Sequence, residues 1–421
     1  MMMHSLVPAM VAMLALVACS APPEKPENAP EAELQDIRLL EAEDPLTPGP
    51  LRALPALDVG LPSSPYSQTA PDLSPDGKAY FSYDGIEGLW VMTLHGEEGS
   101  GSHAVGRVST EGFALADTVP YAWAANSRSI FGVRQKTADP GGFALGPKET
   151  IAISPDGTIA ALPALSHPAG NLDGIYWVGH QGRAIAEFGT KGSFYRPEFE
   201  NSSPTFAMVD ARAGRIIQSY AIPRDVSGKF GVRLTAIDAR LAANGGIFAV
   251  YIVPGETRKW FVWEQGSEPK RLPWTIDTAK VRHFAIAPDL KHVLVVHHLS
   301  AVGPICELWT QCPPPESQDG IVAELRELAS GRVVWTLDGT ADNFSGPIQP
   351  AISPDGRHAL VSLPVHGQKG ERIALISMSD GRVLQEVAEK TSYQTRLSFS
   401  EDGRDVTIAA HSTVRRFRFA D

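Results

Sequence analysis

The sequence predicts an all-β fold, a seven-bladed β-propeller of four-stranded antiparallel blades. The first observation is a turn motif, Ser-Pro-Asp-Gly or a close variant, that recurs between short apolar runs. The second is another hairpin motif, a turn that ends in Gly-Arg, which alternates with the first along the chain. The third is the spacing, because pairs of hairpins divide the body into seven units of about 51 residues, close to the length of propeller blades.

The first turn motif lies between apolar runs at several places. Its full form occurs in "DLSPDGKAYFSY" from Asp72 and in "AISPDGRHALVSL" from Ala351, with variants in "AIAPDLKHVLVV" from Ala285 and "SFSEDGRDVTIAA" from Ser398. A proline at the second turn position fixes φ at about −65°, an aspartate suits the third, and a glycine accepts the left-handed conformation that follows. The motif therefore predicts a tight hairpin that joins antiparallel strands.

The same motif also suggests chemistry, because Ser353, Asp355 and His358 lie within six positions and are the residue types of hydrolytic triads. Its recurrence argues for architecture instead, since near-copies of the motif lie in several units. We therefore expect Ser353 and Asp355 to shape a turn, and His358 to begin the strand that follows.

The second motif ends each turn with Gly-Arg. It occurs in "MVDARAGRIIQSY" (208–220), "LRELASGRVVWTL" (325–337) and "ISMSDGRVLQEV" (376–387), each time between two apolar runs. We assign both short hairpins to one loop face, as the second-to-third strand turns and the links between blades, so that the long loops lie on the other face. Runs such as "AVYIV" (249–253) and "HVLVV" (292–296) are apolar throughout, as expected for strands covered on both sides by neighbouring blades.

Three assignments concern the joints of the ring. The first strand of the first unit is expected around Leu51–Val59. A further Ser-Pro-Asp-Gly, at 154–157, is assigned to a turn between units. The C-terminal run "VRRFRF" (414–419) alternates, with Arg416 and Arg418 on one face, and is expected to be the outer edge strand of the last blade, protected by its arginines.

The first residues predict export and lipidation. An apolar run that ends at Ala18 is too short to span a bilayer but suits a signal peptide over residues 1–18. The stretch Leu16–Cys19 resembles the bacterial lipobox, which implies cleavage before Cys19 and lipidation of that cysteine. By analogy with Gram-negative sorting, Ser20 favours the outer membrane. The alternative is an ordinary secretory signal with an incidental cysteine.

Residues 19–50 are predicted to form a disordered, acidic spacer rich in proline, alanine and glutamate. They show no strand pattern, although a short helix around Glu31–Glu43 is compatible with their composition. The propeller is expected to occupy residues 51–421. The net charge of −11 argues against nucleic-acid binding and against docking onto anionic lipid through a basic patch. Contact with the membrane is therefore expected through the lipid anchor.

The remaining cysteines, Cys306 and Cys312, are expected to form one disulfide, because an exported chain with one leftover pair favours that pairing. A zinc site would recruit His297 and His298, but these are adjacent on an expected strand and so point to opposite faces. A redox pair would require the Cys-x-x-Cys spacing. The histidines near His297 lack metal-binding spacing, and we expect no metal and no cofactor.

Repeats of a strand, Ser-Pro-Asp-Gly and a second strand in an exported lipoprotein resemble the WD40-like repeats of TolB-type propellers. The resemblance covers roughly residues 60–421 and implies a propeller fold without naming a function. A sialidase Asp-box places one residue between its aspartate and its glycine, whereas Asp76 and Gly77 are adjacent here.

Aromatic residues in the long loops are the candidate binding residues. A ring at a loop tip beside an arginine, or one held by a disulfide, suits a protein-binding surface. The alternative is that these rings pack back onto the blades. The candidates are Phe143, Phe194, Tyr195, Arg196, Trp309 and Phe344.

The sequence contains no Gly-x-Ser-x-Gly elbow, no phosphate-binding loop and no Gly-x-Gly-x-x-Gly motif, so no catalytic residue is assigned. We interpret the chain as a non-catalytic, lipid-anchored propeller scaffold with a monomeric body, which mediates protein–protein interaction with envelope proteins. One alternative is a propeller enzyme, a glycan lyase or hydrolase, with a central-channel site. The other is a sugar or peptide receptor that uses the long-loop aromatics. The expected location is the outer membrane, facing the periplasm or the cell surface.

Overall fold

The computed structural model of the protein describes the residues that carry the sheets and their short turns. The chain divides into Met1–Leu34 and Gln35–Asp421, and every described residue lies in the second unit. In this described part, no helix is long and apolar enough to cross a membrane. The described ranges are 38–58, 72–74, 79–84, 88–95, 101–107, 113–115, 122–124, 129–137, 145–154, 158–179, 181–189, 205–221, 236–253, 259–276, 281–297, 318–341, 348–364, 371–390, 395–410 and 413–420.

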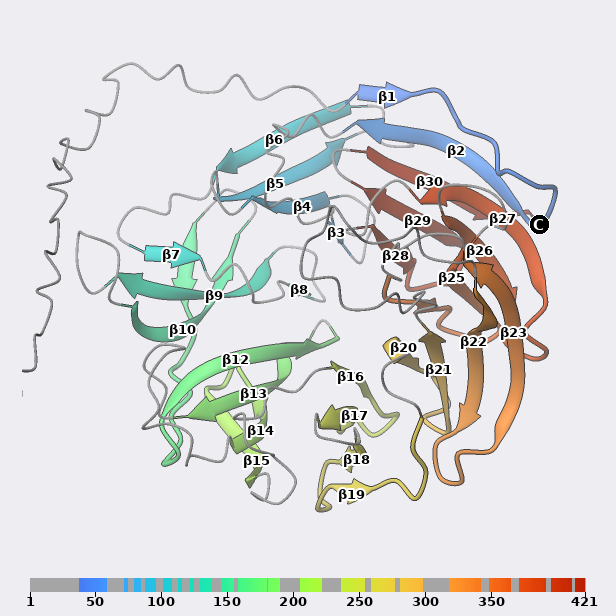
Figure 1. Cartoon of the computed structure of the whole chain (residues 1–421). Coiled ribbons are helices and arrows are strands. Elements are labelled where there is room, and N and C mark those ends of the chain that lie inside the picture. Colours follow the sequence, from blue (N-terminus) through green and yellow to red (C-terminus); the bar gives the residue numbers. More distant parts are fainter. Residues whose placement is uncertain are drawn as a thin grey trace, which may run out of the picture. The chain divides into compact units, whose positions relative to one another are not determined.

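The strands are grouped into consecutive antiparallel sheets, or blades (Figure 1). Blades one and two comprise β3 (Asp72–Leu73), β4 (Ala79–Asp84), β5 (Gly88–His95), β6 (Gly101–Arg107), β7 (Phe113–Leu115), β8 (Ala122–Trp123), β9 (Ile130–Thr137), β10 (Leu145–Ile153) and β11 (Ile159–Ala161). Blades three and four comprise β12 (Asn171–Val178), β13 (Arg183–Gly189), β14 (Thr205–Asp210), β15 (Arg215–Ala221), β16 (Ala236–Leu241), β17 (Ile247–Val253), β18 (Lys259–Glu264) and β19 (Lys270–Arg271).

The remaining blades include both ends of the described chain. Blades five and six comprise β20 (Val281–Ile286), β21 (His292–His297), β22 (Gln318–Glu327), β23 (Val333–Ala341), β24 (Ala351–Ile352), β25 (His358–Pro364), β26 (Glu371–Ser377) and β27 (Val383–Lys390). Blade seven comprises β28 (Arg396–Phe399), β29 (Asp405–Ala410), β30 (Thr413–Phe419), β2 (Leu51–Asp58) and β1 (Arg38–Leu40).

The sheets form the predicted propeller. Among the described residues there are seven, five with four strands and two with five. In blades three to six each strand pairs with the next strand in the sequence. The first strands of neighbouring blades contact one another, from β12 to β16, β16 to β20, β20 to β24 and β24 to β28. The all-β, four-stranded antiparallel architecture is therefore confirmed, and the number of sheets among the described residues is consistent with the seven predicted units.

Continuously apolar strands are buried on both sides, as their sequence predicts. In β21, Val293 and Val295 belong to a core shared with blade four, whereas Leu294 and Val296 belong to a core shared with blade six. All four side chains are at most 1% exposed. Adjacent blades are thus joined by continuous apolar packing.

Blade seven is closed by a strand from the N-terminal side of the chain. β2 pairs with β30, with Leu51 opposite Phe419, and β1 pairs with the other side of β2. The prediction that Leu51–Val59 supplies the first strand of the first unit is therefore wrong, since β3 takes that place. Local patterning cannot reveal this pairing, because the two strands lie at opposite ends of the sequence.

The arginine-rich strand β30 is not an outer edge strand, which corrects the second assignment. β2 covers it, and its arginines bind neighbouring groups. Arg416 Nε donates to the carbonyl oxygen of Pro55 at 3.2 Å. Arg418 donates two hydrogen bonds to the carboxylate of Asp405, at 2.6 and 2.8 Å. These arginines therefore stabilise the strands that close blade seven through hydrogen bonds and do not protect an exposed edge strand.

Residues 38–50, predicted to belong to the disordered spacer over 19–50, are part of the folded unit. Besides the pairing of β1, Thr47 N donates to Glu386 O at 3.1 Å, and Glu386 N donates to Thr47 Oγ1 at 2.8 Å. The helix considered around Glu31–Glu43 is contradicted where β1 lies. The rest of the spacer lies outside the described residues.

Gln385 fastens the closing segment, and its loss is expected to weaken the fold. This side chain is 2% exposed; its Nε2 donates to Leu51 O at 3.0 Å and to Thr47 O at 3.1 Å, and its Oε1 accepts from Leu51 N at 2.7 Å. Gln385→Ala should lower the free energy of unfolding by about 2–3 kcal/mol, because it leaves buried backbone groups unpaired. Urea unfolding measures this loss. Gln218→Ala removes one exposed and one partly buried hydrogen bond and should lose under about 1 kcal/mol. Equal losses in the two variants would contradict the role of Gln385.

The short hairpins join different strands from those predicted. In blade six the Ser-Pro-Asp-Gly turn joins β24 to β25, and the Gly-Arg turn joins β26 to β27. They are thus first-to-second and third-to-fourth turns, because the strand that precedes the Ser-Pro-Asp-Gly turn, β24 in blade six, is the first strand of its sheet. The blade therefore starts one strand later than assigned. The motif at 154–157 likewise lies inside blade two, between β10 and β11. Both hairpin types still share one face, here called the short-turn face, formed by turns such as 287–291, 328–332, 353–357, 378–382 and 400–404.

Candidate interaction groove

A groove opens between blades five and six at the short-turn face, with a volume of about 630 Å³. Two turns of blade six and one turn of blade five form its rim, and β22, β23 and β27 contribute to its walls. Pockets of this size suit a small ligand or a few residues of a peptide. The residues that line it are Ala287, Asp289, His292, Leu325, Val334, Gly356, Arg357, His358, Ser377, Met378, Ser379, Arg382 and Leu384.

The turn with the triad-like residues is structural, as predicted. Ser353 Oγ donates to Asp355 Oδ1 at 2.6 Å and accepts from His358 N at 2.9 Å, and Arg357 N donates to Asp355 Oδ1 at 3.0 Å. The glycine that follows, Gly356, has φ of 71°, the left-handed conformation that the motif requires. The hydroxyl and carboxylate thus hold the backbone that presents Arg357 to the groove.

The corresponding turn of blade seven repeats this hydrogen bonding. Ser400 Oγ donates to Asp402 Oδ1 at 2.6 Å, and Asp405 N donates to Ser400 Oγ at 2.8 Å. Two blades therefore use the same serine and aspartate in the same way. A repeated turn, rather than a single reactive centre, accounts for the repeated motif.

Hydrogen bonds also occupy the acidic side chain on the blade-five rim. Asp289 Oδ2 lies 2.6 Å from His292 Nδ1, and Asp289 Oδ1 accepts from Lys291 N at 2.8 Å. Burial acts to raise the pKa of Asp289, but these bonds outweigh it and hold the pKa below its ordinary value. Asp289 therefore stays ionised and fixes the imidazole of His292 at the groove.

His358 contributes a largely neutral ring to the groove. Burial lowers its pKa below the ordinary value of 6.5, against the opposing influence of the Asp355 carboxylate. The ring packs against Phe419, with centroids 5.0 Å apart. His358 thus joins blade six to blade seven at the groove margin and adds no lasting positive charge at neutral pH.

Two guanidinium groups provide the exposed cations of the rim. Arg357 and Arg382 have side chains 80% and 73% exposed, and their Nε atoms lie 3.7 and 4.0 Å from Asp355 and Asp380. Both separations exceed hydrogen-bonding distance. Within the described residues, neither guanidinium donates a hydrogen bond, so its planar donor set is open to a ligand.

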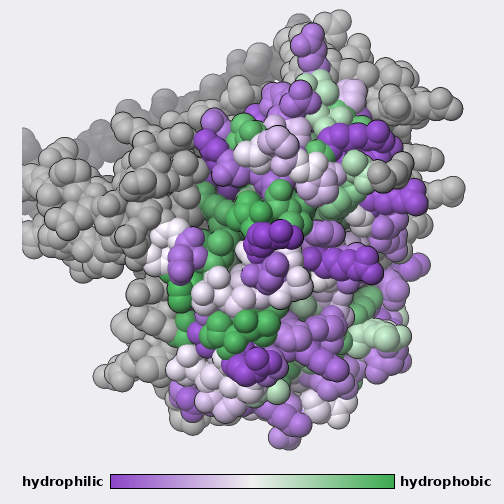
Figure 2. All heavy atoms as spheres, turned by 90° about the vertical axis from the view of Figure 1, so that its right-hand side faces the viewer, coloured by the Kyte–Doolittle hydropathy of each residue, from purple (hydrophilic) through white to green (hydrophobic). Residues whose placement is uncertain are grey.

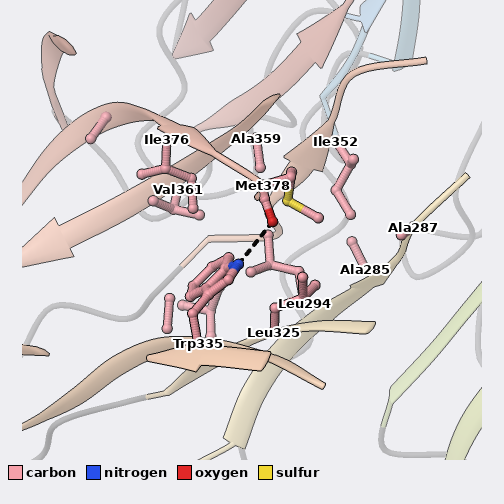
Figure 3. Close-up of a cluster of buried hydrophobic side chains, with 13 residues drawn as sticks. Ala285, Ala287, Leu294, Leu325, Trp335, Ile352, Ala359, Val361, Ile376 and Met378 are labelled. Atoms are coloured by element: carbon pink, nitrogen blue, oxygen red, sulfur yellow. Dashed lines mark hydrogen bonds between the residues drawn. The ribbon is translucent and has the colours of Figure 1, made fainter. Parts of the chain in front are cut away.

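The floor of the groove belongs to the core shared by blades five and six. Ala287, Leu325 and Met378 are members of that core (Figure 3). Trp335 Nε1 donates to Met378 O at 2.8 Å, the dashed line in Figure 3, and so ties the turn of blade six to the outer strand of blade five. The groove therefore rests on close-packed, hydrogen-bonded structure.

The outer wall of the groove carries exposed apolar side chains. Val334 is 37% exposed and lines the groove, and Val333 and Val383 nearby on edge strands are 38% and 36% exposed. Figure 2, which views blades five to seven from outside, shows apolar residues gathered in patches between hydrophilic ones. An apolar wall beside open cations is typical of a recognition surface.

The inner strands carry a half-buried aspartate whose carboxylate joins two blades. Asp238 Oδ2, on β16, accepts from Ile286 N, on β20, at 2.6 Å. Burial raises the pKa of Asp238 above its ordinary value of 3.8, although Arg240 and backbone N–H groups oppose the rise. The raised pKa means that the folded state favours the neutral carboxyl of Asp238. The neutral carboxyl therefore adds stability below pH 3.8, and this added stability is lost as the pH rises through the folded-state pKa.

Asp238→Asn is therefore expected to be tolerated at neutral pH. The amide keeps an acceptor for Ile286 N and removes the partly desolvated charge, so the free energy of unfolding at pH 7 should equal or exceed that of the wild type. Asp238→Ala should lose about 1–3 kcal/mol, because the Ile286 N–H is left unpaired. Urea unfolding of both variants at pH 7 distinguishes them. A loss in Asp238→Asn as large as that in Asp238→Ala would show that the charge itself stabilises the fold.

The histidines noted near His297 have separate structural partners. His297 Nε2 lies 2.9 Å from Glu324 Oε1, and both side chains are buried. His283 Nδ1 lies 3.1 Å from Gln349 Oε1. In the part of the chain that the structure describes, no group of three or more His, Cys, Asp and Glu side chains could hold a metal ion.

The residues singled out from the sequence fall outside the described part, so each remains a prediction. They are the lipidation residue Cys19, the pair Cys306 and Cys312, and the long-loop residues Phe143, Phe194, Tyr195, Arg196, Trp309 and Phe344. The groove was missed, although its arginines end turns of the recognised Gly-Arg and Asp-Gly-Arg type. The repeated Gly-Arg ending can be seen in the sequence. The packing of blade five against blade six, which brings these arginines to one groove, cannot.

Comparison with models of known families finds no match, and comparison with curated proteins finds none. A chain in the solved structure described as "Crystal Structure of Mitotic Checkpoint Complex" is similar, with 13% sequence identity and a TM-score of 0.49, over 98% of this chain and 99% of that chain. This similarity carries no conclusion about function, and the propeller architecture rests on the strand pairings described above.

Proposed function

We propose that the protein is a lipid-anchored, non-catalytic scaffold that binds another protein of the cell envelope through the short-turn face of blades five and six. The groove carries this proposal, because it combines open guanidinium groups with an apolar wall on rigid turns. Rigid, preorganised turns reduce the conformational entropy lost on binding. Anchoring through Cys19 is supported by the lipobox-like sequence that precedes it.

The first described residue, Arg38, lies away from this face. Arg38 pairs with Asp58, and Asp58 pairs with Thr413, whereas the turn at 400–404 leads into Asp405 at the other end of β29. Arg38 therefore lies at the end of blade seven opposite to the short-turn face. A tether that runs from Cys19 to Arg38 supports a scaffold that presents its groove to a partner.

Cross-linking capture from intact membranes tests the proposal with the tagged full chain. The wild type should capture a defined envelope protein, and Arg357→Glu with Arg382→Glu should lose it. Phe194→Ala, Tyr195→Ala and Trp309→Ala test the predicted long-loop surface in parallel, and Cys19→Ala should move the protein out of the membrane fraction. Capture of the same proteins by every variant, or of none by the wild type, would overturn the scaffold.

A further inference from the structure

We infer that the groove binds an extended, acidic segment of the partner, whose carboxylates engage Arg357 and Arg382 and whose apolar side chains cover Val334 and Leu384. This inference rests on the proposed function and specifies the chemistry of recognition. It depends on three features of the groove: unused guanidinium donors, acidic neighbours that are already occupied, and an apolar wall along an edge strand.

The guanidinium groups of the groove differ from the hydrogen-bonded guanidinium groups of blades five and seven. Arg332, which ends the corresponding turn of blade five, and Arg418, on β30 of blade seven, each donate hydrogen bonds to a carboxylate of their own blade. Arg215, which ends the turn of blade three, is open like Arg382, since its Nη2 lies 4.0 Å from Asp210. Arg357 and Arg382 have carboxylates only at 3.7 and 4.0 Å. A planar guanidinium suits bidentate binding of a carboxylate. Two such groups that line one groove favour a ligand with more than one carboxylate.

The nearby carboxylates keep their negative charge, but turn hydrogen bonds use their oxygens, so they leave the guanidinium N–H groups of Arg357 and Arg382 without a hydrogen-bonded acceptor. Asp289 accepts from Lys291 N and pairs with His292 Nδ1. Asp355 accepts from the hydroxyl of Ser353 and from Arg357 N. These aspartates are parts of the turns, whereas the guanidinium ends extend into solvent.

The apolar wall favours an extended backbone. β23 is the last strand of its sheet, and Val334 lies on it beside the groove. In the described residues no further strand pairs with that side of β23. A segment in extended conformation can add hydrogen bonds to such an edge while its side chains alternate between the groove and solvent.

A segment of the chain itself already makes a similar contact, at the outer edge of blade six. Its acidic segment at 41–50 lies along the outer strand of blade six, where Thr47 exchanges hydrogen bonds with Glu386. In the same segment Glu43 Oε2 lies 2.8 Å from Arg415 Nε. An acidic segment of the chain therefore already bonds to the edge strand of blade six through its backbone and pairs a carboxylate with an arginine of blade seven. The groove offers both kinds of contact without an occupant from the described chain.

Selection of random 12-residue peptides displayed on phage tests this inference on the immobilised full chain. Enriched peptides should carry Asp or Glu beside apolar residues, and their Kd should rise about tenfold or more in the variant Arg357→Glu with Arg382→Glu. Lys270→Glu with Arg271→Glu reverses two exposed cations on β19, the edge strand of blade four, and should leave the Kd unchanged. Thermal unfolding should show that both double variants remain folded.

Two results would overturn the inference. The first is enrichment of basic or uncharged peptides, or of peptides whose Kd is the same for both double variants. The second is displacement of the selected peptides by a synthetic peptide of residues 20–37, which would assign the groove to the chain's own acidic segment. Failure of the cross-linking capture would overturn the scaffold, whereas these results overturn only the chemistry assigned to its groove.

Discussion

The variant Gly331→Ala is expected to lose about 3–4 kcal/mol of its free energy of unfolding. Gly331 has φ of 72°, and a Cβ added there would lie 2.2 Å from Cγ of Trp274. The left-handed conformation destabilises a residue with a Cβ by about 1–2 kcal/mol, and overpacking adds about 1–3 kcal/mol. Trp274 is held in place, because its Nε1 donates to Leu328 O at 2.7 Å in a buried site.

The matched control is Gly245→Ala. Gly245 has φ of 76°, and an added Cβ would meet nothing within 4 Å. This variant bears the backbone strain alone and should lose about 1–2 kcal/mol. Denaturant unfolding of both variants measures the difference. Equal losses would contradict the tight docking of Trp274 from blade four onto the turn of blade five.

Trp335→Ala is expected to lose about 3–5 kcal/mol, the usual range for removing a buried aromatic side chain. Trp335 is 8% exposed, its Nε1 hydrogen bonds to Met378 O, and its ring lies so close to Gly381 that an added Cβ there would be 2.6 Å away. Because Met378 lines the groove, the variant should also weaken the binding of acidic peptides to the groove.

Trp335→Phe separates the contribution of the ring from that of its hydrogen bond. The phenyl ring keeps most of the apolar contact but leaves Met378 O without its donor, so the loss should be about 1–2 kcal/mol. Urea unfolding of both variants gives the comparison. If Trp335→Phe lost as much stability as Trp335→Ala, the hydrogen bond rather than ring packing would hold blade six to blade five.

The sequence predicts the blades because their determinants are local. Pro354, Asp355 and Gly356 specify a turn through their own backbone preferences and through hydrogen bonds that span five residues. The run at 292–296 is apolar at every central position because each face of β21 meets another blade. Such features lie within one hairpin and can be predicted from its sequence.

Closure of the ring is not predictable in this way. The pairing of β2 with β30 joins segments more than three hundred residues apart, and no residue in Leu51–Asp58 distinguishes a first strand from a closing strand. Inner strands of two residues, such as Ala351–Ile352, are also too short to show a pattern, which shifted the assignment of the turns by one strand. The alternation in β30 correctly predicted a strand, but it did not predict that β2 pairs with it.

The groove escaped prediction for the same reason. Arg357 and Arg382 lie in two hairpins of blade six, and Asp289 and Val334 come from blade five. Each has an ordinary local explanation as a turn or strand residue. Only the packing of adjacent blades places them around one cavity, and only the hydrogen bonds show which charged groups are already engaged.

Photo-cross-linking from inside the groove tests the central claim most directly. A photoreactive residue replaces Val334 in the full chain, and the cross-link is formed in intact cells. We expect one major adduct with another protein. The adduct should be lost when Arg357 and Arg382 are both changed to glutamate, and it should be retained when Lys270 and Arg271 are changed instead. Absence of an adduct in the otherwise wild-type chain, or the same adducts in all three chains, would contradict the groove as the site of partner binding.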